Sequence, residues 1–466
     1  MKKYNNRVSE INIAYIGGGS RGWAWTFMTD LALDDQISGT IRLYDLDKKA
    51  AENNEIIGNH LMQRDDAKGN WKFVVSDSMK EALTGCNFVV ISILPGTFDE
   101  MAVDVHMPER LGIYQSVGDT AGPGGIIRAL RTIPMYVEIA EAIRDYSPEA
   151  WVINYTNPMS LCVRTLYYVF PGIKAFGCCH EVFGTQKVLQ GIYENVTGEK
   201  IGDWHDIYVD VLGINHFTWF SGVSYKGTDI FPIYREYIDK HFNEGFEEQS
   251  DNWMNSSFNC ANRVKMDLFN RYGWIAAAGD RHLAEFMPGN EYLNDPETVK
   301  RWKFQLTSVD WRKEDLQQRL DRSRKLASFE EEVKLEPTGE EGISLIKALC
   351  GLERLISNVN IPNSALQVSN LPADAVVETN AVFELDKIHP IMSGSLPRAI
   401  YDLELPHVEN HDRTLRAALT GDRNLVVESF EHDPNVKGHN LTHKDVEKLV
   451  CDMIAGTKNY LPEYWK

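Results

Sequence analysis

The chain has 466 residues, 43% hydrophobic and 25% charged, so it can bury a sizeable core and is not a mainly disordered protein. Its 48 lysines and arginines are outnumbered by 67 aspartates and glutamates, and the formal net charge of −19 disfavours nucleic acid or an anionic membrane as a partner. We recognise no signal peptide and no apolar run near the roughly 20 residues of a membrane span, and the seven cysteines are too scattered for a disulfide framework. We therefore expect a cytoplasmic protein.

The first 180 residues alternate short apolar runs, typical of strands, with amphipathic runs, typical of helices. The predicted strands are Ile11–Ile16, Ile41–Tyr44, Lys72–Val75, Phe88–Leu94, Trp151–Asn154 and Ile173–Gly177. The predicted helices between several of them are Trp23–Leu33, Lys48–Arg64, Ile127–Arg144 and Pro158–Val169. Because parallel strands need long crossover connections, this alternation predicts an α/β fold with a doubly wound, Rossmann-like parallel sheet.

After about residue 200 the pattern becomes mixed α+β. Strand-like runs cover Asp206–Gly213, Phe217–Tyr225 and Ala375–Glu378, and helix-like runs cover Pro296–Lys303, Trp311–Glu332 and Lys444–Ile454. We expect this half to be built on the edge of the first sheet. No Pro/Gly/Ser-rich linker marks a boundary, and we divide the chain into a Rossmann-like domain over residues 1–200 and an α+β domain over residues 201–466.

A glycine-rich loop, Gly17-Gly18-Gly19-Ser20-Arg21-Gly22, lies between the first long strand and the first helix. In a Rossmann fold such a loop lets the backbone approach a pyrophosphate, which the helix N-terminus then binds. The next strand ends at Asp45, where a carboxylate suits the ribose hydroxyls of NAD and repels the 2′-phosphate of NADP. The predicted NAD contacts are Gly17, Gly18, Gly19, Ser20, Arg21 and Asp45. An ordinary glycine turn beside a surface aspartate is the alternative.

Polar or loop-forming residues follow two other predicted strands. Pro95 comes after the strand that starts at Phe88, and Asn154 and Asn157 surround the end of another. Since loops at the carboxyl ends of such strands face the cofactor, we predict that Pro95 and Asn154 contact it and that Asn157 binds a substrate hydroxyl. A turn without a ligand contact, or a helix N-cap at Asn157, is the alternative.

Three further segments carry side chains suited to metal binding or proton transfer. They are Cys178-Cys179-His180-Glu181, Asn215-His216 and Gly279-Asp280-Arg281-His282. Thiolate and imidazole are good ligands for divalent transition metals, and imidazole or carboxylate can move protons. Spacing alone leaves structural roles open, because adjacent cysteines are not arranged as metal ligands and no sequence rule connects the three segments.

Taken together, GGGSRG, LYDLD, GPGGIIRALRTIP, NYTNPMS, CCHEV, GINHF and NIPN…NLPADAVVE, in this order, resemble the NAD- and manganese-dependent family-4 glycoside hydrolases. That family is akin in fold to lactate and malate dehydrogenases. The resemblance implies NAD and Mn²⁺, or another divalent transition metal, as cofactors, and a homodimer or homotetramer. It further implies hydrolysis of a small α-glycoside through oxidation at C3, deprotonation at C2, elimination and addition of water.

The resemblance also implies roles for individual residues. Cys179 and His216 match the metal ligands, and Asn157 matches an amide that touches the substrate. His180 takes the position beside the ligand cysteine, where it can donate a proton or orient a hydroxyl. Asp280 matches the base at C2 less securely, and His282 is the alternative.

The expected substrate is an unphosphorylated α-glycoside, above all an α-galacturonide. The acidic segment Thr97-Phe98-Asp99-Glu100 stands where phosphosugar members resemble one another in an arginine, and it would repel a phosphate. The motif from Cys179 to Val182 resembles that of α-galacturonide hydrolases, and we expect Arg281 to bind the uronate carboxylate.

Several alternatives stay open. An α-galactosidase, α-glucosidase or α-glucuronidase of the same family would share these motifs. A malate- or lactate-type dehydrogenase would share the glycine loop, but it needs an aspartate with a nearby arginine where this chain has Cys179-His180-Glu181. A non-catalytic NAD-binding sensor would tolerate replacement of Cys179.

Overall fold

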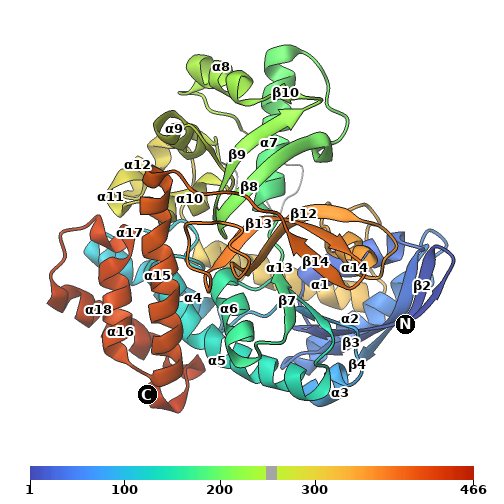
Figure 1. Ribbon diagram of the computed structural model, residues 1–466. Coiled ribbons are helices and arrows are strands. Elements are labelled where there is room, and N and C mark those ends of the chain that lie inside the picture. Colours follow the sequence, from blue (N-terminus) through green and yellow to red (C-terminus); the bar gives the residue numbers. More distant parts are fainter. Residues whose placement is uncertain (248–259, 466) are drawn as a thin grey trace.

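The computed structural model describes residues 1–247 and 260–465. Its largest element is a ten-stranded sheet, and a smaller four-stranded sheet lies beside it, with helices around both (Figure 1). No helix in these two ranges is both long enough and apolar enough to cross a membrane.

Six parallel strands form the main part of the large sheet. They are β2 (Arg7–Ile16), β3 (Ile37–Tyr44), β4 (Asn70–Val75), β5 (Phe88–Ile91), β6 (Trp151–Asn154) and β7 (Lys174–Gly177). Their spatial order is β7-β6-β5-β2-β3-β4, while β1 (Lys2–Tyr4) pairs with β2 in antiparallel orientation. This is the doubly wound Rossmann order, with its switch point between β2 and β5. The predicted fold is confirmed.

Helices cover both faces of this sheet. They are α1 (Trp23–Leu33), α2 (Lys48–Leu61), α3 (Met79–Leu83), α4 (Phe98–His106), α5 (Gly122–Tyr146), α6 (Met159–Val169) and α7 (Glu181–Thr197). The helix predicted to start at Ile127 begins at Gly122, because Pro123 in the first turn is compatible with a helix N-terminus. The strand predicted to run to Leu94 ends at Ile91, and α4 and α7 were not predicted.

The second half of the chain extends the same sheet. The strands β12 (Leu355–Pro362), β13 (Val376–Glu384) and β14 (Lys387–Pro390) add to it in antiparallel orientation beyond β7. The junction is the pairing of Asn360 on β12 with Gly177 on β7. The expectation that this half is built on the edge of the first sheet is therefore confirmed, although β12 and β14 were not predicted.

The smaller sheet carries a hairpin that matters for the site. It consists of β8 (Ile207–Ile214), β9 (Phe217–Tyr225), β10 (Thr228–Asp229) and β11 (Ile275–Ala276). In β8–β9, Ile214 pairs with Phe217, so Asn215 and His216 form a two-residue turn. The hairpin rests on the large sheet, where Asn380 Nδ2 of β13 donates to Val209 O at 2.6 Å.

The remaining helices pack around these sheets. They are α8 (Phe231–His241), α9 (Arg263–Tyr272), α10 (Asp280–Phe286), α11 (Gly289–Tyr292), α12 (Pro296–Arg301), α13 (Val309–Ala327), α14 (Gly342–Leu349), α15 (Arg398–Thr420), α16 (Arg423–His432), α17 (Pro434–Lys437) and α18 (His443–Gly456). Short 3₁₀ turns cover Pro108–Leu111, Trp204–Asp206, Lys458–Tyr460 and Glu463–Trp465. The C-terminal helices α15, α16 and α18 lie together on one side of the molecule and share a core with α5 (Figure 1).

Candidate active site

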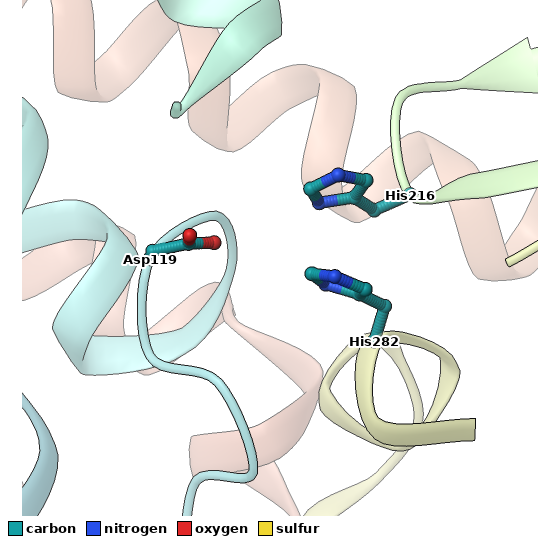
Figure 2. Close-up of side chains that lie close together, drawn as sticks. All are labelled: Asp119, His216 and His282. Atoms are coloured by element: carbon teal, nitrogen blue, oxygen red, sulfur yellow. The ribbon is translucent and has the colours of Figure 1, made fainter. Parts of the chain in front are cut away.

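Three side chains from distant parts of the chain converge on one point. Asp119 lies in the loop before α5, His216 in the β8–β9 turn and His282 on α10 (Figure 2). One ligand atom from each lies within 4.8 Å of the other two. We call these three residues the 119–216–282 cluster.

The backbone and a neighbouring threonine fix the His216 ring. His216 has a φ of 67°, a left-handed conformation that non-glycine residues rarely adopt and that is concentrated at functional sites. Thr120 Oγ1 donates to Asp119 Oδ1 at 2.6 Å and lies 2.9 Å from His216 Nδ1. Because the hydroxyl proton is used on Asp119, Nδ1–H of His216 donates to Thr120 and the Nε2 lone pair is left for another partner.

His282 is packed against His216, with ring centroids 3.8 Å apart and planes inclined by 33°. Its Nδ1 is buried and has no hydrogen-bond partner within the described ranges. Its Nε2 lies 3.7 Å from Glu181 Oε1, and Glu181 is itself fixed because its Oε2 accepts from Gly279 N at 2.6 Å. Burial lowers the pKa of His282, and burial together with the nearby His282 lowers the pKa of His216 to about 3. Both imidazoles are therefore neutral near pH 7, with lone pairs available for a metal or a proton.

Asp119 supplies the negative charge of the cluster. Burial alone would raise the pKa of its carboxyl, but the positive charge of Arg128, with a contribution from the hydrogen bond of Thr120, holds that pKa down at about 2. Asn157 Nδ2 donates to Asp119 Oδ2 over 3.4 Å, which places the predicted substrate residue Asn157 beside the cluster. One ionised carboxylate with neutral imidazoles is a donor set that suits divalent transition metals. Asp119 was not predicted from the sequence, because no recognisable motif includes it.

The predicted metal ligands are placed differently. His216 belongs to the cluster. The Cys179 sulfur does not, because it is not among the ligand atoms that lie within 4.8 Å of one another. Cys179 is buried nearby, its carbonyl accepting from Asn358 Nδ2 at 3.2 Å. Burial and the carboxyl of Glu378 raise the pKa of the Cys179 thiol, which a hydrogen bond with Asn215 offsets only in part. Cys179 as a ligand stays a prediction.

His180 lies at the exposed rim of this region. Its side chain is 52% exposed, and its Nε2 lies 3.9 Å from Glu181 Oε1. The ring centroid is 5.9 Å from that of Trp23, and Nδ1 lies 3.8 Å from Glu340 Oε1. Through Glu181, His180 is therefore adjacent to the cluster and open to solvent at the same time.

Two neighbours of His282 on α10 have structural partners. Asp280 is fully buried, and its two oxygens accept from Val264 N and Lys265 N, both at 3.0 Å, at the start of α9. Arg281 donates from Nε to Gln305 O at 3.0 Å and from Nη2 to Ser116 O and to Thr307 Oγ1. Successive residues of a helix point about 100° apart, so only His282 of the three faces the cluster. Asp280 as base and Arg281 as uronate partner stay predictions that these contacts do not favour.

The glycine loop forms a cradle at the switch point of the sheet. Gly17 has a φ of 90°, and a Cβ there would lie 2.0 Å from Ser92 O of the β5 side. A Cβ on Gly18 would lie 2.8 Å from Leu43 Cβ, and one on Gly19 would lie 2.7 Å from Ala50 Cβ. The loop therefore needs glycine at all three positions. The approach of a pyrophosphate to the backbone has the same requirement, so the loop fits a dinucleotide.

The other predicted cofactor residues line or support this cradle. Asp45 accepts from Gly19 N through Oδ2 and from Asp47 N through Oδ1, both at 2.8 Å. Asn54 Nδ2 donates to Ser20 O at 3.0 Å, Arg21 pairs with Asp47 at 2.8 Å, and Arg319 of α13 donates to Arg21 O at 3.0 Å. These contacts hold the loop in place.

Pro95 and Asn154 have internal partners. Pro95 O accepts from Arg131 Nε at 3.1 Å. Asn154 is fully buried; its Oδ1 accepts from Tyr136 Oη and from Thr156 N at 3.1 Å, and its Nδ2 donates to Thr156 O at 3.0 Å. Asn154 therefore shapes the loop after β6, and its contact with a cofactor stays a prediction.

The contacts of the acidic segment after Pro95 do not support the prediction that this segment repels a phosphate. Glu100 closes a capping box at the start of α4, where Thr97 N and Oγ1 donate to its Oε2 at 2.9 and 2.6 Å. Asp99 is exposed and pairs with Lys313 at 2.6 Å. Since both carboxylates have other partners, repulsion of a phosphate by them is no longer evidence for the substrate class.

The fold and the glycine cradle define a Rossmann-type dinucleotide-binding architecture with a metal-competent cluster beside it. The model of the family 4 glycosyl hydrolases matches residues 12–194, and the model of their C-terminal domain matches residues 211–436. This chain belongs to family 4 of the glycosyl hydrolases.

Individual relatives agree with this assignment. An alpha-galacturonidase of Lachnoclostridium phytofermentans is 66% identical over 464 residues, 99% of each chain, and an alpha-galacturonidase of Bacillus subtilis is 50% identical over 96% of this chain and 97% of that protein. The crystal structure of lplD from Bacillus subtilis superposes with a TM-score of 0.90 at 50% identity, covering 96% of this chain and all of that one. A 6-phospho-beta glucosidase from Thermotoga maritima, solved with manganese, NAD⁺ and glucose-6-phosphate, shares the fold at a TM-score of 0.74 and 19% identity, over 97% and 99% of the two chains.

Proposed function

We propose that the protein is an α-galacturonidase that uses NAD and Mn²⁺, or another divalent transition metal, to hydrolyse unphosphorylated α-galacturonides. The observation that carries this proposal is the placement of a metal-competent cluster and a glycine cradle beside the same sheet. The cluster contacts the loop after β6 through Asn157, and the cradle follows β2 two strands away. The substrate class is supported by alpha-galacturonidases that are 50–66% identical over nearly the whole chain.

When bound, NAD would supply reversible hydride removal at a sugar carbon, and the metal would supply Lewis-acid stabilisation of the adjacent oxygens. Asp119 and His216 would hold the metal, because one is an ionised carboxylate and the other is a neutral imidazole that keeps a lone pair on one ring nitrogen. The proposed ligand role of Cys179 is retained from the family resemblance.

We propose His282 as the base that removes the C2 proton. Its Nδ1 is buried, unpaired within the described ranges and unprotonated near neutral pH, whereas the oxygens of Asp280 already accept backbone N–H groups. His180 would protonate the departing glycosidic oxygen, a role that its exposed position at the rim supports. Asn157 holds a substrate hydroxyl beside Asp119.

Hydrolysis of 4-nitrophenyl α-D-galacturonide, measured with and without NAD, Mn²⁺ and a thiol reductant, tests this function. We expect activity only when NAD and the metal are both present, with many turnovers per NAD and no accumulation of NADH. Equal or faster hydrolysis of the matching α-D-galactoside would favour an α-galactosidase. Stoichiometric NADH formation from a hydroxy acid would favour the dehydrogenase alternative.

The organisation of the protein is proposed on separate grounds. A boundary near residue 200, with the NAD-binding part before it and the catalytic part after it, is supported by the two family models, which meet between residues 194 and 211. A cytoplasmic location is supported by the seven free cysteines. A homodimer or homotetramer is supported by exposed apolar side chains near β12–β14: Ile356, Leu385 and Met392.

A further inference from the structure

Arg128 is a buried arginine whose two terminal nitrogens have no hydrogen-bond acceptor among the described residues. It lies in the second turn of α5 and is only 8% exposed. Its Nε donates to Asn157 O at 3.1 Å, and within residues 1–247 and 260–465 neither terminal nitrogen has a hydrogen-bond acceptor or a carboxylate within 4.0 Å. Both terminal nitrogens keep some contact with accessible space, because neither is a fully buried atom without a partner. A buried cation without a contacting counter-ion is costly, which indicates that a ligand supplies one.

Two other arginines near the site do not have this property. Arg131, one turn further along α5, forms a fully buried pair with Asp104 and also donates to Pro95 O at 3.1 Å. The guanidinium of Arg281 donates to Ser116, Gln305 and Thr307. The guanidinium groups of Arg131 and Arg281 therefore hold loops together. The terminal nitrogens of Arg128 are left for a ligand.

Arg128 is connected directly to the cluster. The residue that accepts from its Nε, Asn157, donates through its own amide to Asp119. The Asn157 Oδ1 is buried without a partner in the described ranges, so the space between Arg128 and Asp119 presents both a donor group and an acceptor without protein partners. A sugar held by its C2 and C3 oxygens at the cluster has its C5 substituent on the opposite side of the ring. The two terminal nitrogens of Arg128 offer a cationic donor pair for that substituent.

We propose that Arg128 binds the C6 carboxylate of the uronide through its two terminal nitrogens and thereby sets the preference for uronides over neutral galactosides. The inference rests on the proposed function and replaces Arg281 in the role expected from the sequence. A planar guanidinium matches a carboxylate in a two-point contact. A galactoside carries a neutral hydroxymethyl group at the same position, so it leaves the buried cation unpaired.

The test compares R128M with the wild-type holoenzyme on 4-nitrophenyl α-D-galacturonide and 4-nitrophenyl α-D-galactoside. We expect the ratio of the two kcat/KM values, galacturonide over galactoside, to fall by about 100-fold. Binding of free D-galacturonate, measured by calorimetry, should weaken in parallel, while R128K should give an intermediate ratio because it keeps the charge and loses the fork. R398M serves as the control, since Arg398 is an exposed arginine paired with Asp402 on α15.

Each outcome decides a separate point. If the wild-type enzyme fails to hydrolyse the galacturonide, the proposed function is wrong. If the wild-type enzyme does so and R128M, with R128K as the folded substitute should R128M not fold, loses activity on both substrates equally, Arg128 has no role in selectivity. If R281M and not R128M lowers the ratio, the carboxylate binds Arg281.

Discussion

Replacing His216 with alanine is expected to lower kcat/KM for the galacturonide by at least about 1000-fold and to weaken Mn²⁺ binding by about 10- to 100-fold. His216 is the cluster residue whose ring is fixed on both sides, by a left-handed backbone and by Thr120. Alanine removes the Nε2 donor while leaving the turn in place. Mn²⁺ titration of the metal-free protein, followed by electron paramagnetic resonance, measures the affinity independently of turnover.

H443A is the matched control for this experiment. His443 is 68% exposed on α18 and pairs with Glu431 at 2.7 Å, away from the cluster. Its replacement should leave both the rate and the Mn²⁺ affinity as in the wild type. An H216A protein that is folded and still binds Mn²⁺ with wild-type affinity would remove His216 from the metal site.

The second large effect is expected at His282. H282A should also lose about 1000-fold in rate or more, but it should bind Mn²⁺ within about threefold of the wild type, because His282 acts on the proton and not on the metal. In D₂O the wild-type enzyme should incorporate deuterium at C2 of the released galacturonate, and H282A should not.

D280N separates the two candidates for the base. Because Asp280 holds the start of α9 through two backbone hydrogen bonds, we expect D280N to lower the thermal stability and to retain exchange at C2. Loss of exchange in a folded D280N protein, together with its retention in H282A, would assign the base to Asp280. Weakened Mn²⁺ binding in H282A would make His282 a metal ligand.

The first half of the fold was predictable because its strands are buried on both faces. The strand β5 consists of Phe88-Val89-Val90-Ile91, all buried, and such an uninterrupted apolar run between helical patterns indicates a parallel sheet. The strand β12 was missed for the opposite reason. Asn358 and Asn360 are both buried in it and interrupt the apolar pattern, and Asn358 Nδ2 donates to Glu378 Oε1.

The site was predictable only in part, because tertiary contacts assemble it. The motifs around His216 and His282 were found, but nothing in the sequence connects either of them to Asp119. On α10 the motif did not show which of three adjacent polar residues faces the cluster, since that depends on the contact of Asp280 with α9. Likewise Arg281 and Arg128 cannot be distinguished as cations until the partners of their guanidinium groups are seen.

The position of bound Mn²⁺ tests the central claim most directly. A crystal of the protein with Mn²⁺ and NAD, measured at the manganese absorption edge, should show one strong anomalous peak within about 2.5 Å of a ring nitrogen of His216 and of a carboxylate oxygen of Asp119. A fully occupied manganese site elsewhere in the molecule, with the 119–216–282 cluster empty, would contradict the account.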